Sequence, residues 1–161
     1  MSLVYFTSDL HLGHSLAAKK RGFGSVEEHD KSVIKSLFVA KKRDKLFILG
    51  DIAMQKDRLA LIAQLPCKNK VLLLGNHDKF HAMEYLAVFQ DIIGPVTYKD
   101  YWLTHIPMHP QELYRRNGNL HGHIHKGGAS PSLDLPYFNV NWDWHRRPVL
   151  YQEIDKIMTQ V

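Results

Sequence analysis

Three runs of apolar residues in the first half of the chain each stop at polar residues that can bind a metal ion. They are Leu3–Ser8 before Asp9-Leu10-His11, Lys45–Leu49 before Gly50-Asp51, and Lys70–Leu74 before Gly75-Asn76-His77-Asp78. A short apolar run that halts at a glycine or a polar turn is typical of a buried strand. Because open α/β sheets carry their chemistry beyond the carboxyl ends of the strands, the runs predict one site at one sheet edge.

The segments between these runs predict helices that return the chain for parallel pairing. Ser25 and Glu28 have the form of a capping box, and apolar residues at helical spacing then predict a helix over 26–42. A second helix is expected over 55–65, ending before Pro66, and a third over 79–89. The basic segment 15–24 is expected to form a surface loop or a short helix. Strand, helix and strand in alternation predict a parallel sheet.

From Asp91 onward the apolar runs become shorter and turn residues separate them. Strands are expected at 92–93, 96–98, 101–104, 119–121 and 137–140, and helices at 111–116 and 152–158. We expect this half to be mostly antiparallel. The predicted fold class is α/β, with two packed mixed sheets flanked by helices, in a single domain over residues 1–161.

Composition narrows the function classes. The chain has 161 residues, enough for one domain with a real core, and neither a long apolar run nor a leader pattern, so we expect a cytoplasmic protein without a membrane partner. Cys67 is the only cysteine, which excludes an internal disulfide and a thiolate zinc site. A net charge of +5 is compatible with phosphate-bearing partners.

Two further polar clusters lie in the second half: Thr104-His105, and Gly122-His123 followed by His125. Residues two apart on an extended backbone point to the same side, so Asp9 with His11, and His123 with His125, can each face one site. Carboxylate, imidazole and amide donors together suit manganese, iron or zinc better than calcium.

In this order the clusters resemble the calcineurin-like metallophosphoesterase family, whose pattern is D-x-H, G-D, G-N-H-[DE], H and G-H-x-H. The chain has DLH, GD, GNHD, TH and GHIH over residues 9–125. The tail FNVNWDWHRRPVLYQEI is similar to the small bacterial and bacteriophage branch of that family.

The resemblance implies a site with two divalent ions, manganese being favoured and iron, zinc, nickel and cobalt being alternatives. It assigns Asp9, His11 and His125 to the first ion, Asn76, His105 and His123 to the second, and Asp51 to both. A hydroxide bridging two ions about 3.5–4 Å apart would attack phosphorus. His77 would act as general acid, with Asp78 orienting its imidazole. His14, Asn76 and His77 are the candidate substrate contacts.

The expected activity is phosphoester hydrolysis, with nucleotide-type or cyclic phosphodiesters favoured and nucleic acid as one class of substrate. Alternatives are a phosphomonoesterase, a nucleotide pyrophosphatase, an inactive metal-binding scaffold and a nucleic-acid-binding protein. The oligomeric state is left open.

Other histidines and tryptophans have plainer interpretations. For His14 two interpretations stay open, a contact to the substrate and no contact to it. His109 is expected at the rim of the site, and His121 is expected to be structural. We expect His29 and Asp30 to lie on a polar face of the helix over 26–42. The spacing of Trp142 and Trp144 puts them on one face of a strand, where packing is favoured over base stacking.

Overall fold

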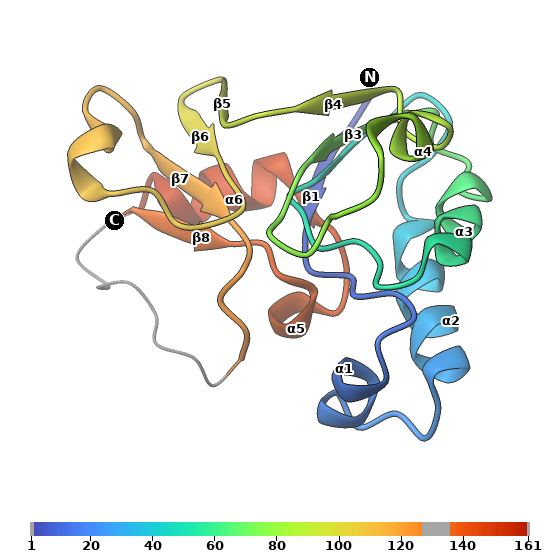
Figure 1. Ribbon diagram of the computed structural model, residues 1–161. Coiled ribbons are helices and arrows are strands. Elements are labelled where there is room, and N and C mark those ends of the chain that lie inside the picture. The colour runs from blue at the N-terminus through green and yellow to red at the C-terminus, as the bar shows by residue number, and fades with distance from the viewer. Residues whose placement is uncertain (1, 127–135, 161) are drawn as a thin grey trace.

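A five-stranded sheet forms around the three apolar runs that end at the candidate ligands, with further strands at 91–93 and 149–150 (Figure 1). This is a computed structural model, and it describes residues 2–126 and 136–160. The strand order is β4-β3-β2-β1-β9, with β1 to β4 parallel and β9 antiparallel to β1. The bounds are β1 Val4–Thr7, β2 Lys45–Ile48, β3 Asn69–Leu73, β4 Asp91–Ile93 and β9 Val149–Leu150. Thr7 pairs with Ile48 and Ile48 with Leu72, so three carboxyl ends finish level, as predicted.

The second sheet has the order β5-β6-β7-β8, and its strand directions correct the sequence-based prediction. Its strands are β5 Val96–Tyr98, β6 Tyr101–Leu103, β7 Gly118–His121 and β8 Tyr137–Asn139. Only β5 and β6, joined by a tight turn at Lys99, pair antiparallel; β6 with β7 and β7 with β8 are parallel. The long connection 104–117 explains the difference, because a parallel pair needs a crossover rather than a hairpin.

The two sheets pack face to face, and helices cover the outer faces, which gives the predicted α/β architecture (Figure 1). Between the sheets lie residues of both, among them Phe6 stacked on Phe47 with ring centroids 5.1 Å apart, Leu103 and Leu120. A second core cluster joins the other face of the first sheet to the helices after β1 and β2. Cys67 is buried in that cluster among apolar side chains.

The helices predicted over 26–42, 55–65, 79–89 and 111–116 are present in shorter form, and the one predicted over 152–158 is found over Tyr151–Met158. The observed elements are α1 Ser15–Lys20, α2 Val26–Leu37, η1 Lys56–Arg58, α3 Leu59–Ala63, α4 Ala82–Leu86, η2 Pro110–Leu113, α5 Trp142–His145 and α6 Tyr151–Met158. Before β2, the Asp44 carboxylate accepts hydrogen bonds from Lys41 N at 2.8 Å and Leu3 N at 2.9 Å. These bonds fix a turn where the longer helix would have continued. None of the helices in the described ranges is long and apolar enough to cross a membrane.

Trp142 and Trp144 lie on the short helix α5, not on a strand. The Asn141 side chain caps this helix by accepting a hydrogen bond from Asp143 N at 2.8 Å. On a helix, residues two apart do not share a face. Trp142 is accordingly buried, while Trp144 is 42% exposed.

His29 and Asp30 are buried on α2, which corrects their placement on a polar helical face. His29 Nδ1 donates to Asp30 Oδ1 at 2.8 Å, and Arg21 Nη1 donates to His29 Nε2 at 2.7 Å. The Asp30 carboxylate also accepts from Gly13 N at 3.0 Å. The pair therefore anchors the loop between β1 and α1, close to His11 and His14.

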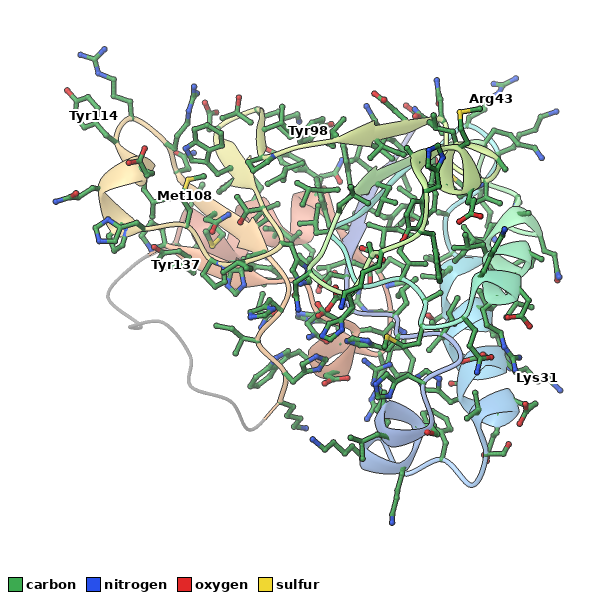
Figure 2. All side chains as sticks on the ribbon, viewed as in Figure 1. Lys31, Arg43, Tyr98, Met108, Tyr114 and Tyr137 are labelled. Carbon is green, nitrogen blue, oxygen red and sulfur yellow. The ribbon has the colours of Figure 1, made fainter. Side chains whose placement is uncertain are left out.

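Asp30→Ala is expected to lower the free energy of unfolding by about 2–4 kcal/mol, because it leaves the buried donors of Gly13 and His29 without an acceptor. Urea denaturation at equilibrium measures this loss. The matched control is Lys31→Ala on the same helix, since Lys31 points away from the fold into solvent (Figure 2). Equal midpoints for the two variants would contradict the anchoring role.

Candidate metal centre

The loops that carry the candidate ligands are hydrogen-bonded to one another. Asp9 N donates to Gly50 O at 2.9 Å and His11 N to Asp51 O at 3.0 Å, so the loops after β1 and β2 run side by side. His123 N donates to the Asp9 carboxylate at 2.9 Å. Ligands from distant parts of the sequence are thus placed by backbone contacts between their own loops.

Four candidate ligands hold a left-handed backbone conformation. Their φ angles are 55° at Asp9, 49° at His11, 56° at Asp51 and 66° at His123. They are four of the seven non-glycine residues with positive φ among those described. Each such residue costs about 1–3 kcal/mol and clusters of them occur at functional sites. The fold therefore holds these side chains in directions that a relaxed backbone would not give.

One donor group combines Asp9, His11 and His125. His125 Nε2 lies 3.3 Å from His11 Nε2 and 3.7 Å from Asp9 Oδ1, and His11 Nε2 lies 3.9 Å from Asp9 Oδ1. Asp9 and His11 are buried, whereas the His125 side chain is 44% exposed. Three donor atoms that converge within 4.8 Å of one another can share one cation.

A second donor group lies beside the first and includes Asp51 and His105. His105 Nε2 is 3.4 Å from Asp51 Oδ2 and 3.0 Å from Asn76 Oδ1, and His123 Nδ1 is 3.1 Å from the same Asn76 oxygen. Asp9 is also within reach of this group. Asp51 Oδ2 lies 3.7 Å from His11 Nε2, so this carboxylate stands between the two groups.

Hydrogen bonds outside the donor groups fix which nitrogen two of the imidazoles present. His105 Nδ1 donates to Leu49 O at 2.6 Å, and His125 Nδ1 donates to Asp143 Oδ2 at 2.7 Å. Because the acceptors cannot donate in return, Nε2 of each ring carries the lone pair in the neutral imidazole, and it faces the other donors. Partners of this kind orient the histidines of metal sites.

Burial and charge shift the acidities of these groups. Burial raises the pKa of Asp9 to about 6. Burial also opposes ionisation of Asp51, but the hydrogen bond and charge of His105 outweigh it and lower the pKa of Asp51. Burial lowers the pKa of His11, which keeps its imidazole neutral and able to donate a lone pair.

The donor set fits divalent cations. Two carboxylates, four imidazoles and one amide oxygen meet at the sheet edge, and burial opposes the negative charge of Asp9, which a bound cation would neutralise. His11 Nε2 and His125 Nε2 lie 3.3 Å apart, and the buried His11 Nδ1 has no hydrogen-bond partner among the described residues. Mixed nitrogen and oxygen donors favour manganese, iron or zinc over calcium.

Gly75 and Gly122 are required by the closeness of the carboxylates. A Cβ at Gly75 would collide with the Asp51 carboxylate, and one at Gly122 would collide with Ser8 Oγ and the Asp9 carboxylate. Both glycines adjoin candidate ligands in the motifs. Their place in the sequence thus follows from the packing of backbone against the donor groups.

Asp78 has a different role from the expected pairing with His77. Its carboxylate accepts hydrogen bonds from Asp51 N at 2.7 Å, Ile52 N at 2.9 Å and Gly75 N at 2.8 Å. These three amides occupy both carboxylate oxygens. Asp78 therefore ties the loop after β3 to the loop after β2 and positions Asp51.

Arg21 and Asp143 were not among the sequence-based candidates, yet they support the first donor group. Asp143 holds His125, and Arg21 Nε donates to Asp143 Oδ1 at 2.6 Å. Arg21 also donates to Asp9 O at 2.6 Å and to Leu10 O at 2.9 Å. Neither residue lies in one of the five motifs, but Asp143 lies in the tail FNVNWDWHRRPVLYQEI, whose similarity to the family branch is the one sequence feature that could have indicated it.

Asp143→Asn is expected to weaken metal binding by the first donor group by about 10–100-fold, because the amide no longer provides a charged acceptor for His125. Titration of the metal-free protein with Mn²⁺ by calorimetry measures the change. Asp57→Asn, at a side chain 76% exposed on η1, serves as the control. Unchanged affinity in Asp143→Asn would show that His125 is held without its carboxylate.

His77 and His14 line a cavity of about 410 Å³ next to the first donor group, and we call it the basic cavity. It is lined by His11, His14, Leu16, Ala17, Lys20, Arg21, His77, His125, Lys126, Asp143 and Arg146. The ring centroids of His77 and His14 lie 5.7 and 5.6 Å from that of His11. His14 also caps α1, since its Nδ1 accepts from Ala17 N at 2.9 Å. An anion at the donor groups would lie within reach of these side chains.

The remaining histidines lie away from the donor atoms. His121 is buried, and its Nδ1 donates to Gly122 O at 2.8 Å, which gives it a structural role, as expected. His109 is exposed and caps η2.

Comparison with known proteins agrees with the fold and with the motifs. Residues 2–159 match the family model described as calcineurin-like phosphoesterase. The Gene 66 protein of Mycobacterium phage L5 is 32% identical over 163 residues, covering 78% of each protein. The Gene 66 protein of Mycobacterium phage D29 is 39% identical over 95 residues, covering 52% of this chain and 44% of that protein.

Two solved structures show the same fold. A protein of unknown function from Aquifex aeolicus gives a TM-score of 0.77 at 24% identity, covering 98% of this chain and 100% of that one. The nuclease MPE of Pseudomonas putida gives a TM-score of 0.50 at 21% identity, covering 76% of this chain and 61% of that one. At these identities the likeness extends to the fold alone.

Proposed function

The chain belongs to the calcineurin-like phosphoesterase family, and we propose that it is a phosphodiesterase that depends on two divalent metal ions. One observation carries the proposal. Seven oxygen and nitrogen donors from five separate loops converge in two adjoining groups, with Asp51 between them. A binding scaffold would not require every ligand position of the family pattern to be filled.

We assign Asp9, His11 and His125 to one ion, Asn76, His105 and His123 to the other, and Asp51 to both. The approach of His11 and His105 to the same Asp51 oxygen, at 3.7 and 3.4 Å, supports the shared assignment. Two bound ions lower the pKa of a coordinated water and neutralise charge on phosphoryl oxygens. Manganese is the ion we favour.

His77 is the proposed general acid for the leaving oxygen. Its backbone N–H donates to Asp51 Oδ1 at 2.9 Å, which fixes the residue beside the donor groups. Its side chain lines the basic cavity, from which a proton can reach an ester oxygen held at the centre. His14 and Asn76 are the further proposed contacts to the phosphoryl group.

The preference for diesters, of nucleotide type or cyclic, rests on His77, since a general acid at the centre serves the poor leaving groups of diesters. Lys20, Lys126 and Arg146 line the basic cavity and favour a diester with further negative charges beyond its own single charge. The chain as a whole carries +5. Nucleic acid therefore belongs among the proposed substrates.

Paired nitrophenyl esters test the proposal. Metal-stripped protein, reloaded with Mn²⁺, is expected to hydrolyse bis-(p-nitrophenyl) phosphate faster than p-nitrophenyl phosphate, and the metal-free protein neither. Faster hydrolysis of the monoester would identify a phosphomonoesterase. If neither ester were hydrolysed by protein with two ions bound, the enzymatic proposal would be overturned and a scaffold favoured.

A further inference from the structure

A second cleft, of about 700 Å³, adjoins the metal centre at the donors that the basic cavity does not reach. Its lining includes Leu74, Asn76, Pro95, His105, Ile106 and Met108, and we call it the apolar cleft. Asn76 and His105 belong to the second donor group. Among the described residues, no aspartate, glutamate, lysine or arginine lines it.

Exposed apolar side chains distinguish this cleft from the ordinary surface. Leu74 is 44% exposed and Ile106 is 54% exposed, although each stands beside a residue of the metal centre. Met108 lies further along the loop after β6, where Tyr137 donates from its hydroxyl to Met108 O at 2.5 Å and holds this wall in place (Figure 2). Apolar residues gathered at one place and left open to solvent mark a binding surface.

The two clefts have opposite chemical character and share no lining residue. The basic cavity contacts His11 and His125 of the first donor group and is lined by residues of α1 and α5, two helices that are low in Figure 1. The apolar cleft contacts Asn76 and His105 of the second group and is lined by residues of the β4–β5 turn and the loop after β6. The metal centre thus adjoins a cavity with cationic residues on one side and an apolar cleft on the other.

We propose that the substrate is an asymmetric phosphodiester, with an aromatic or apolar arm in the apolar cleft and an anionic leaving arm in the basic cavity. This inference rests on the proposed function. A nucleoside joined through its phosphate to a phosphorylated remainder, as at the end of an oligonucleotide, has this form, because the base is aromatic and the remainder is charged.

The position of His77 decides which arm leaves. His77 lines the basic cavity and does not line the apolar cleft, so the oxygen that it protonates belongs to the anionic arm. Water supplies the oxygen that bonds to phosphorus, the bond from phosphorus to the anionic arm breaks, and His77 protonates the departing oxygen. The proton lost by water returns His77 to its starting state. The products are a monoester of the apolar arm and a free alcohol on the anionic arm.

Two synthetic diesters test this asymmetry. Both release 3-carboxy-4-nitrophenolate, a charged leaving arm, and they differ only in a benzyl or a methyl group as the retained arm. With Mn²⁺-loaded protein the benzyl ester is expected to show a KM about tenfold lower, because its ring leaves water in the apolar cleft. Ile106→Ser is expected to reduce this ratio to about threefold or less.

Ile157→Ser is the matched control, since Ile157 is 47% exposed on α6 and lines neither cleft. A second readout does not depend on turnover. Benzyl phosphate, titrated into protein with labelled isoleucine and methionine methyl groups, is expected to shift the Ile106 and Met108 signals and to leave Ile157 in place.

The outcomes separate this inference from the function on which it rests. The asymmetric substrate would be wrong if the two diesters had equal KM values, or if the protein hydrolysed bis-(p-nitrophenyl) phosphate but neither charged diester. Both results would remain consistent with a phosphodiesterase. Failure to hydrolyse bis-(p-nitrophenyl) phosphate would overturn the proposed function, and this inference with it.

Discussion

Asp51→Asn is expected to empty both metal positions of the protein and to lower phosphodiester hydrolysis by about 10³-fold or more, since two-metal stabilisation is worth several kcal/mol. Asp51 Oδ2 faces His11 at 3.7 Å and His105 at 3.4 Å, so one substitution removes a charge from both donor groups. Asparagine has nearly the same shape as aspartate and still offers an oxygen that accepts from His77 N. The loop should therefore keep its conformation. The effect should therefore be on metal content rather than on folding.

Elemental analysis of the protein after gel filtration in Mn²⁺ measures the occupancy, and thermal unfolding of the metal-free form checks the fold. Asp91→Asn, at an exposed residue of β4, is the control and should retain both ions. Asp51→Glu is expected to fail as a rescue, because the added methylene would move the carboxylate away from its present position between His11 and His105. Two tightly held ions in Asp51→Asn would contradict the shared assignment.

The position of the donor residues could be predicted because it depends on local sequence and on one property of parallel sheets. Strands β1, β2 and β3 are visible as apolar runs, and their carboxyl ends meet wherever the strands pair in parallel. The residues after the runs, Asp9 and Asp51 among them, are then brought together without knowledge of any side-chain contact. The left-handed conformations at these residues, in contrast, leave no mark in a single sequence, because aspartate and histidine have many other roles.

Contacts between distant parts of the chain explain what could not be predicted. Asp143 lies 122 positions after Arg21, and their ion pair depends on how α5 packs against the loop after α1. The role of Asp78 depends on amides of another loop, which replace His77 as its partners. His29 and Asp30 have polar side chains, so their burial becomes evident only when Arg21 and Gly13 are seen to pair with them.

His77→Ala is expected to lower turnover of diesters with alkyl leaving groups by about 10²–10⁴-fold while both ions remain bound. The side chain of His77 is outside both donor groups. The residue contacts Asp51 of the centre through its backbone N–H, which alanine retains. Diesters of p-nitrophenol need little proton donation to the departing oxygen, so their loss should be much smaller. Rates for a series of leaving groups, with metal content measured on the same samples, give the comparison.

If His77 donates a proton, the rate should depend more steeply on leaving-group acidity in His77→Ala than in the parent protein. A purely electrostatic contact with the phosphoryl oxygens would instead act on every diester alike and leave the slope unchanged. His109→Ala, at an exposed histidine outside the basic cavity, should change neither the rates nor the slope. Equal losses for nitrophenyl and alkyl diesters would assign His77 to charge stabilisation, and loss of metal from His77→Ala would place it among the residues that build the centre. Either result would also remove the reason for placing the leaving arm in the basic cavity.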